Sequence, residues 1–468
     1  MNKADVPFLS VAELSRLIEA RDVSPVEVTE AYLERIDDLD FKFNSFLTVS
    51  RGEALEAARE AERAITRGGY QGPMHGIPVA VKDQFWTKGI RTTGGSRILA
   101  DFVPDEDATV IANLKKAGAV ILGKTNLTEF AMGGGIERYS PPRNPWDLDM
   151  RTGGSSGGSG AATAAFLCAT SLGEDTGGSI RWPATWCGLA GHRPTWGRVS
   201  RYGVMRGVWS MDTVGPISRT VEDAAITLTA IAGHDPKDPY TWNKPVPDYR
   251  QALDENIRGV RVGVVIEQLN NEMTGPETRD AVVKATALLE KLGAAVEEVS
   301  LPITNHAPLL GTVPLMVEPA SYQREWIRQR LQDYGHNNRV ALLTGSILPA
   351  SAYYKVQKLR SLLRQQVHEV LEKYDVLVTP TSATPARRIA DDPIVTSKAN
   401  AFGSQFLFTR IFNLASAPAI SVPCGFSSQG LPIGLQIGGR SGADETVLRV
   451  AHAYEQSTSW HSRRPPTA

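Results

Sequence analysis

Residues 153–160 read Gly-Gly-Ser-Ser-Gly-Gly-Ser-Gly, and residues 174–181 read Glu-Asp-Thr-Gly-Gly-Ser-Ile-Arg. A glycine-serine run often marks a flexible linker. Here the run is too short to join domains, and a small-residue apolar segment at 161–167 that predicts a helix follows it at once. Clustered backbone N–H groups also bind phosphate, but the Gly-Lys-Ser/Thr ending of that motif is missing. The two serine segments are therefore candidates for catalytic chemistry.

The pattern Gly-x-Ser-x-Gly at 153–157 also fits the nucleophile elbow of α/β-hydrolases. That site needs an acidic residue and then a histidine later in the chain. None of the histidines from His192 to His461 stands in a context that marks a base, and the second serine segment stays unexplained. The alternative is a base other than histidine.

Lys82 is a candidate for that base, because it follows a predicted buried strand at residues 77–81, Ile-Pro-Val-Ala-Val. Burial disfavours the charged form of lysine, and a neutral amine accepts a proton from serine. Spacing alone leaves open a surface lysine paired with Asp83. Residues 176–179, Thr-Gly-Gly-Ser, are likewise either an ordinary glycine turn or a place where N–H groups converge on an oxyanion.

Taken together and in this order, these segments closely resemble the amidase signature family. The resemblance covers roughly residues 9–457, and its most specific part is 76–219. The matching segments are Gly-Ile-Pro-Val-Ala-Val-Lys-Asp at 76–83, Gly-Lys-Thr-Asn-Leu-Thr-Glu-Phe at 123–130, Arg-Asn-Pro-Trp at 143–146, the glycine-serine run at 153–158, Asp-Thr-Gly-Gly-Ser-Ile-Arg at 175–181, Pro183, Gly188, and Arg-Pro-Thr-Trp-Gly-Arg-Val-Ser at 193–200.

The resemblance implies three reacting residues. Ser179 matches the family's nucleophile, which becomes acylated. Ser155 matches a bridging serine, held by a cis peptide, that relays a proton between nucleophile and base, and Lys82 matches the base. The family's reaction requires no metal and no organic cofactor, so we expect neither.

The resemblance also implies an oxyanion hole and groups that support it. Its donors would be four backbone N–H groups, those of Thr176, Gly177, Gly178 and Ser179. Asp175 and Arg181 are expected to support the site rather than to react. Three residues are candidates for a wall of the substrate pocket: Met132, Gly133 and Gly134.

One branch of the family is the glutamine-consuming subunit of a tRNA-dependent amidotransferase, and residues 130–134 and 353–355 resemble it. That branch has an acidic residue for the amino group of glutamine where residues 406–412 read Phe-Leu-Phe-Thr-Arg-Ile-Phe. Apolar groups do not stabilise an ammonium, so we expect an uncharged substrate part. The sequence favours a stand-alone serine hydrolase that cleaves the carbon–nitrogen bonds of small or aryl amides, with carbamates (urethanes) and esters as further substrates. One alternative is the glutaminase-type subunit, and a more remote one is a non-catalytic binding protein.

Composition limits the kinds of partner that we expect for this protein. The 468 residues include 50 Lys and Arg against 51 Asp and Glu, a net charge of -1 that lacks the basic footprint of a nucleic-acid binder. The three cysteines are far apart and form no CxxC pair, so neither disulfides nor a cysteine zinc site is expected. With no signal-peptide pattern and no long apolar run, we expect a cytoplasmic protein with a small-molecule substrate and no nucleic-acid or membrane partner.

Short apolar runs alternate with helix-length segments after residue 76, which favours an α/β fold with a sheet covered on both faces. The resemblance implies a single large α/β/α sandwich around a mixed β-sheet. Residues 1–70 are expected to form a helical segment that packs on the core and offers a surface for a homodimer. Residues 71–468 are expected to form the catalytic domain, the whole being one compact domain.

Overall fold

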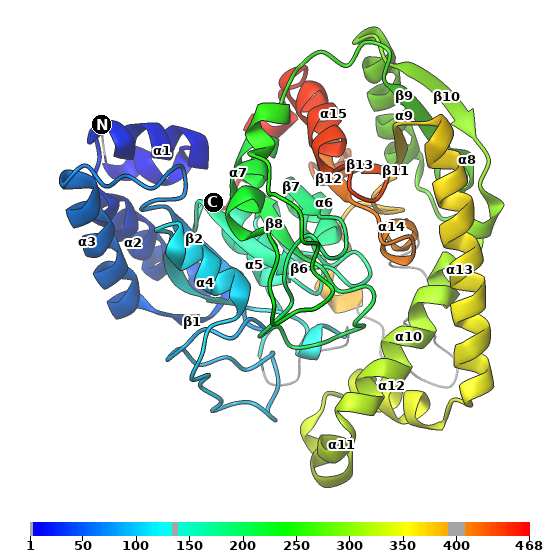
Figure 1. Ribbon diagram of the computed structural model, residues 1–468, viewed down its shortest axis with the longest axis horizontal. Helices are drawn as coiled ribbons and strands as arrows, with labels where there is room; N and C mark the ends of the chain where they lie inside the picture. The colour runs from blue at the N-terminus through cyan, green and yellow to red at the C-terminus, as the bar shows by residue number, and fades with distance from the viewer. Residues whose placement is uncertain (1–2, 133–138, 392–407) are drawn as a thin grey trace.

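The computed structural model describes residues 3–132, 139–391 and 408–468, and it is built on one mixed sheet of 11 strands (Figure 1). In spatial order the strands are β1 (Phe46–Val49), β3 (Val120–Thr125), β2 (Pro78–Lys82), β6 (Thr170–Glu174), β8 (Val214–Ser218), β7 (Ala190–Arg193), β12 (Ala419–Phe426), β13 (Pro432–Gly439), β11 (Val376–Pro380), β9 (Arg261–Val265) and β10 (Ala295–Val299). β2 runs parallel to β3 and β6, and β9 runs parallel to β10 and β11, whereas the other neighbours are antiparallel. A separate two-stranded sheet joins β4 (Arg143–Asn144) to β5 (Asp147–Arg151).

Except between β7 and β8 and between β12 and β13, the strands of the sheet are connected through α-helices. The helices are α1 (Val11–Ala20), α2 (Pro25–Phe43), α3 (Arg51–Thr66), α4 (Thr109–Lys116), α5 (Gly157–Ala164), α6 (Arg181–Cys187), α7 (Val221–Ile231), α8 (Ile266–Leu269), α9 (Pro276–Lys291), α10 (Ala307–Tyr322), α11 (Arg324–Arg330), α12 (His336–Ile347), α13 (Ala350–Lys373), α14 (Arg410–Leu414) and α15 (Asp444–Gln456). None of the helices in the described part of the chain is both long and apolar enough to cross a membrane.

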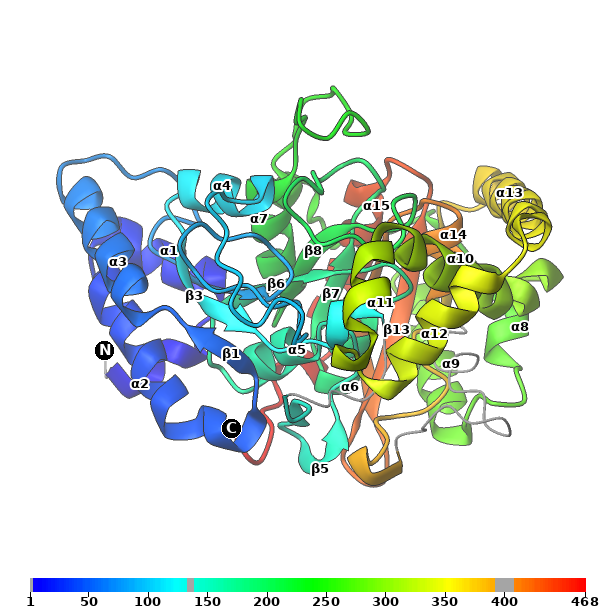
Figure 2. The same ribbon diagram turned by 90° about the horizontal axis from the view of Figure 1, so that it is seen from below.

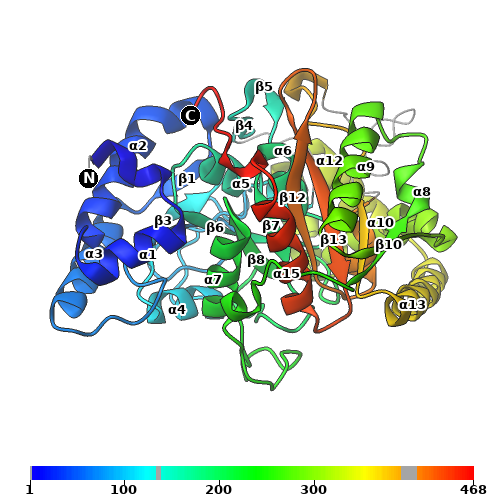
Figure 3. The same ribbon diagram turned by 90° about the horizontal axis from the view of Figure 1, so that it is seen from above.

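Helices cover both faces of the sheet. Successive residues of a strand point to opposite faces, so two neighbouring glycines of β13 identify the layers. A Cβ at Gly438 would meet the ring of Phe412 in α14, whereas a Cβ at Gly439 would meet Val447 in α15. Gly434, which points the same way as Gly438, faces α6. The predicted α/β/α sandwich around a mixed sheet is therefore confirmed (Figures 2 and 3).

The strand predicted at 77–81 is confirmed as β2, and the short apolar runs at 119–122, 260–265 and 376–380 fall in β3, β9 and β11. The sequence analysis missed the central strands β6, β8 and β7. Small and polar residues interrupt the apolar run of β6, which reads Thr-Ser-Leu-Gly-Glu, although every one of its residues is buried. Such a strand lacks the periodicity on which a prediction depends.

The N-terminal segment forms α1, α2 and α3, and it also contributes β1 to the edge of the sheet beside β3. Capping boxes begin α1 and α2, at Ser10 with Glu13 and at Ser24 with Glu27. Tyr32 of α2 is fully buried and belongs to the same apolar cluster as Val79 of β2. The division at residue 70 and the homodimer surface stay predictions.

We expect Ser24→Ala to loosen the first turn of α2, because the Glu27 N–H donates to Ser24 Oγ at 3.1 Å. Loss of an N-cap costs about 1 kcal/mol, so local opening makes hydrogen exchange at the Glu27 amide roughly fivefold faster. Mass spectrometry of exchanged peptides measures this. Ser361→Ala, on an exposed position inside α13, is the control and leaves exchange in its helix unchanged or slower. Equal exchange at Glu27 in Ser24→Ala and the unmodified protein would contradict this account.

Candidate active site

Lys82 is the last residue of β2, and its side chain is completely buried. Its Nζ lies 2.7 Å from Ser155 Oγ and 3.3 Å from the carbonyl oxygen of Glu174. Burial lowers the pKa of Lys82, although the nearby Glu174 carboxyl opposes this shift. The alternative of a surface lysine is therefore wrong. The Gly154–Ser155 peptide bond is cis, as the family resemblance implied.

Ser179 lies on the loop between β6 and α6, which runs beside the glycine-serine segment. The Ser156 N–H donates to the Ser179 carbonyl oxygen at 3.3 Å, so the two serine segments are neighbours. Gly178 has a φ of 123° and faces Thr409, whose Oγ1 would lie 2.3 Å from a Cβ at that position. Only glycine fits both the backbone conformation and the space.

The buried carboxylate of Asp175 accepts several hydrogen bonds that hold this loop in place. Arg181 donates to both carboxylate oxygens at 3.0 Å, and Asn413 Nδ2 donates to Oδ1 at 2.6 Å. Arg193 Nη1 lies 3.5 Å from the same oxygen. Burial by itself would raise the pKa of Asp175, but the two guanidinium groups hold it below the ordinary value. Asp175 and Arg181 thus form a buried ion pair that positions the loop, while Arg193 and Asn413 are partners that the sequence analysis missed.

The predicted oxyanion hole has fewer candidate N–H donors than the resemblance implied. The Gly178 N–H donates to Asp175 Oδ1 at 2.8 Å, so this donor already has an acceptor and its assignment to the oxyanion hole is corrected. Among the described residues, the N–H groups of Thr176, Gly177 and Ser179 have no such acceptor. These three remain the candidates.

Two further buried carboxyl groups, those of Glu174 and Asp212, lie near Lys82. Thr176 Oγ1 lies 2.6 Å from Glu174 Oε1 and 2.7 Å from Asp212 Oδ1, and Glu174 Oε2 lies 3.4 Å from Lys82 Nζ. A hydroxyl group has one proton to donate, so Thr176 can donate to only one of the two carboxyl groups at a time. Burial raises the pKa of Glu174 to about 7 and also raises the pKa of Asp212. Burial thus favours the neutral form of both carboxyl groups near Lys82.

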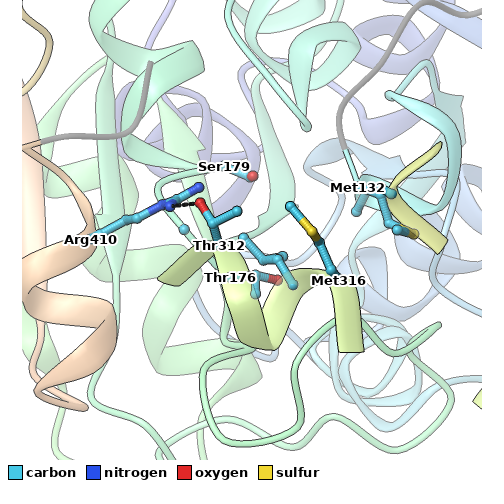
Figure 4. Close-up of a pocket in the computed structure, with 10 residues that line it drawn as sticks. Met132, Thr176, Ser179, Thr312, Met316 and Arg410 are labelled. Carbon is cyan, nitrogen blue, oxygen red and sulfur yellow. Dashed lines mark hydrogen bonds between the residues drawn. The ribbon is translucent and has the colours of Figure 1, made fainter. Parts of the chain in front are cut away.

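Ser179 also lines a pocket, which Figure 4 shows. Its lining residues are Ala131, Met132, Thr176, Gly177, Ser179, Thr312, Leu315, Met316, Ala341 and Arg410. The predicted wall residue Met132 lines this pocket beside Ser179, whereas Gly133 and Gly134 lie outside the described residues. The remaining wall comes largely from α10, which contributes Thr312, Leu315 and Met316 and which the sequence analysis did not connect with the site.

Arg410 is the described residue of the stretch 406–412 that bears on the substrate pocket. Residues 406 and 407 lie outside the described part of the chain. Phe408 and Phe412 are buried in the core, and Arg410 is the residue of α14 that lines the pocket with Ser179. In the described part of this stretch, the side chain that lines the pocket is therefore basic and not aromatic, and the expectation of an uncharged substrate part stays a prediction. Within the described residues, no cluster of His, Cys, Asp or Glu could hold a metal ion.

The chain belongs to the amidase family. The family model described as Amidase matches residues 27–448. This confirms the resemblance to the amidase signature enzymes that the serine and lysine segments indicated.

Three comparisons place the chain within this family. It is 44% identical to a glutamyl-tRNA(Gln) amidotransferase subunit of Moorella thermoacetica, with 98% of each chain covered. A second similar protein is a solved structure from work on a vestigial protein complex and the evolutionary origins of an s-triazine catabolic enzyme. It is 32% identical to this chain, with a TM-score of 0.90 over 96% of this chain and 98% of the other. A bacterial aryl acylamidase of the amidase signature family is 27% identical, with a TM-score of 0.88 over 97% of this chain and 98% of the other.

We expect Glu174→Gln to move the acidic limb of the pH profile of amide hydrolysis to lower pH. The change removes a carboxylate 3.4 Å from Lys82 Nζ, so the ammonium loses an attraction and the pKa of Lys82 falls. A shift on the order of one pH unit follows from losing one close opposite charge. The measurement is kcat/KM between acid and alkaline pH.

Glu455→Gln is the matched control, because Glu455 is also buried, with a pKa raised to about 8, but contacts the Val221 N–H of α7 instead of the lysine. Its profile keeps the position of the unmodified protein. An acidic limb that stays in place, or moves to higher pH, in Glu174→Gln would refute the role given to Glu174.

Proposed function

We propose that this protein hydrolyses the carbon–nitrogen bond of amides, with Ser179 as nucleophile, Ser155 as proton relay and Lys82 as base. The observation that carries the proposal is the 2.7 Å contact between Lys82 Nζ and Ser155 Oγ in a fully buried setting. Burial favours the neutral amine that a base requires. The exposure of Ser179 to the pocket supports its part in the scheme.

In this scheme neutral Lys82 accepts the proton of Ser155 while Ser155 accepts the proton of Ser179, and Ser179 Oγ attacks the carbonyl carbon. The N–H groups of Thr176, Gly177 and Ser179 stabilise the negative oxygen that results. Collapse of this intermediate breaks the carbon–nitrogen bond, and the relay returns the proton to the leaving amine. Water then attacks the acyl-enzyme by the same route and releases the acid and free Ser179.

A second candidate is the glutaminase-type subunit of a tRNA-dependent amidotransferase. The 44% identity to an amidotransferase subunit over 98% of both chains favours it above the stand-alone amidase that the sequence analysis preferred. In that case partner subunits and tRNA take part, so the expectation of no nucleic-acid partner applies to the stand-alone enzyme alone. The likeness to an aryl acylamidase supports the stand-alone interpretation, and hydrolysis of carbamates and esters rests on the shared acyl-transfer chemistry.

The test is the release of aniline from three matched compounds: a simple anilide, an N-phenyl carbamate (a urethane of aniline), and γ-glutamyl anilide. Release from the first or second compound, lost in Ser179→Ala by a factor of at least about 1,000, supports a stand-alone hydrolase. Release confined to γ-glutamyl anilide, rising with partner subunits and tRNA, supports the glutaminase.

Ser50→Ala is the control for the variant. Ser50 is a buried serine whose hydroxyl donates to the Ile121 carbonyl at the far edge of the sheet, and its loss leaves turnover unchanged. Unaltered turnover in Ser179→Ala would overturn the assignment of the nucleophile.

A further inference from the structure

The pocket beside Ser179 contains a buried guanidinium group. Arg410 is the first residue of α14 and is 2% exposed. Its Nη1 donates to Thr312 Oγ1 at 2.6 Å and to the Pro308 carbonyl oxygen, which fastens it to α10. Figure 4 shows Arg410 and Thr312 on one side of Ser179, with Met316 and Met132 on the other.

The surrounding backbone leaves room for this side chain. A Cβ at Gly311 of α10 would lie 2.7 Å from Arg410 Cδ and 3.1 Å from its Nε. At Gly177, whose N–H is a candidate oxyanion donor, a Cβ would lie 3.6 Å from the same Nε. The guanidinium is therefore held directly against the loop that carries the nucleophile.

The group keeps its charge in this position. Burial lowers the pKa of Arg410 to about 9, so it remains protonated near neutral pH. The other nine described residues that line the pocket are uncharged. A substrate carboxylate would gain charge-assisted hydrogen bonds there, whereas a substrate ammonium would find no acidic side chain among these ten.

We propose that Arg410 binds a carboxylate of the substrate, so that this enzyme prefers amides that carry a carboxylate group and lack an amino group beside it. This inference rests on the proposed amide hydrolysis and names the substrate class for the same site. It separates the pocket from one built for glutamine, whose carboxylate and ammonium sit on one carbon.

The test compares kcat/KM for three anilides that release the same aniline. Glutaric acid monoanilide carries the carboxylate, 5-oxohexanoic anilide replaces its charged oxygen with a methyl group of similar size, and γ-glutamyl anilide adds the ammonium. We expect glutaric acid monoanilide to exceed each of the other two by about tenfold or more. In Arg410→Met this preference over the ketone disappears, and in Arg410→Lys it falls to an intermediate value because the lysine lacks the planar fork.

Arg198→Met is the matched control. Arg198 is also a buried arginine bonded to a hydroxyl and a carbonyl, those of Tyr249 and Pro245, but it does not line the pocket. Its variant keeps the preference for the carboxylate.

Each result decides the proposal. Equal rates for the carboxylate and the ketone in the unmodified protein, or an undiminished preference in Arg410→Met, would overturn it, and the first result needs no variant to fold. Calorimetric binding of glutaric acid monoanilide to Ser179→Ala tests the pocket without turnover: binding tighter than that of the ketone supports the proposal, and equal or weaker binding overturns it. Failure of hydrolysis itself appears separately, as aniline release that Ser179→Ala does not reduce.

Discussion

The buried carboxylate of Asp175 is the interaction on which the catalytic loop depends. Removing a charge from water is costly unless partners replace the lost hydration. Here Arg181, Arg193 and Asn413 do so from α6, β7 and α14, together with N–H groups of the loop itself. The same contacts that satisfy the charge therefore draw three distant segments around the loop and fix the position of Ser179.

At Lys82 burial acts on a basic group and disfavours its charged ammonium form. Lys82 is fully buried, and its carboxyl neighbour Glu174 is linked to Asp212 through the Thr176 hydroxyl. A fully ionised Glu174 would favour the ammonium form and oppose a function as base, whereas a carboxyl group that holds a proton part of the time relaxes this attraction. The lysine is thus tuned by a neighbouring group whose own pKa lies near 7.

The pocket and the overall identity to relatives are separate sources of information about the substrate. The 44% identity to an amidotransferase subunit covers 98% of both chains, whereas the pocket is lined by ten described residues, five from α10, α12 and α14 and five from residues 131, 132, 176, 177 and 179. Such an identity is an average over the whole chain, of which these ten positions are a small part. The substrate preference that we propose depends on one of these positions, Arg410.

The sequence by itself determined the family, because the lysine and serine segments occur together and in the family's order, and this resemblance in turn implied the sandwich and the assignment of Lys82, Ser155 and Ser179 to one site. It missed β6, β7 and β8, whose small residues carry no periodic signal. Tertiary structure alone decided that Gly178 donates to Asp175 instead of an oxyanion, that Glu174 meets Asp212 through Thr176, and that Arg410 enters the pocket. Each of these contacts joins residues that packing in three dimensions brings together. No local sequence pattern encodes that packing.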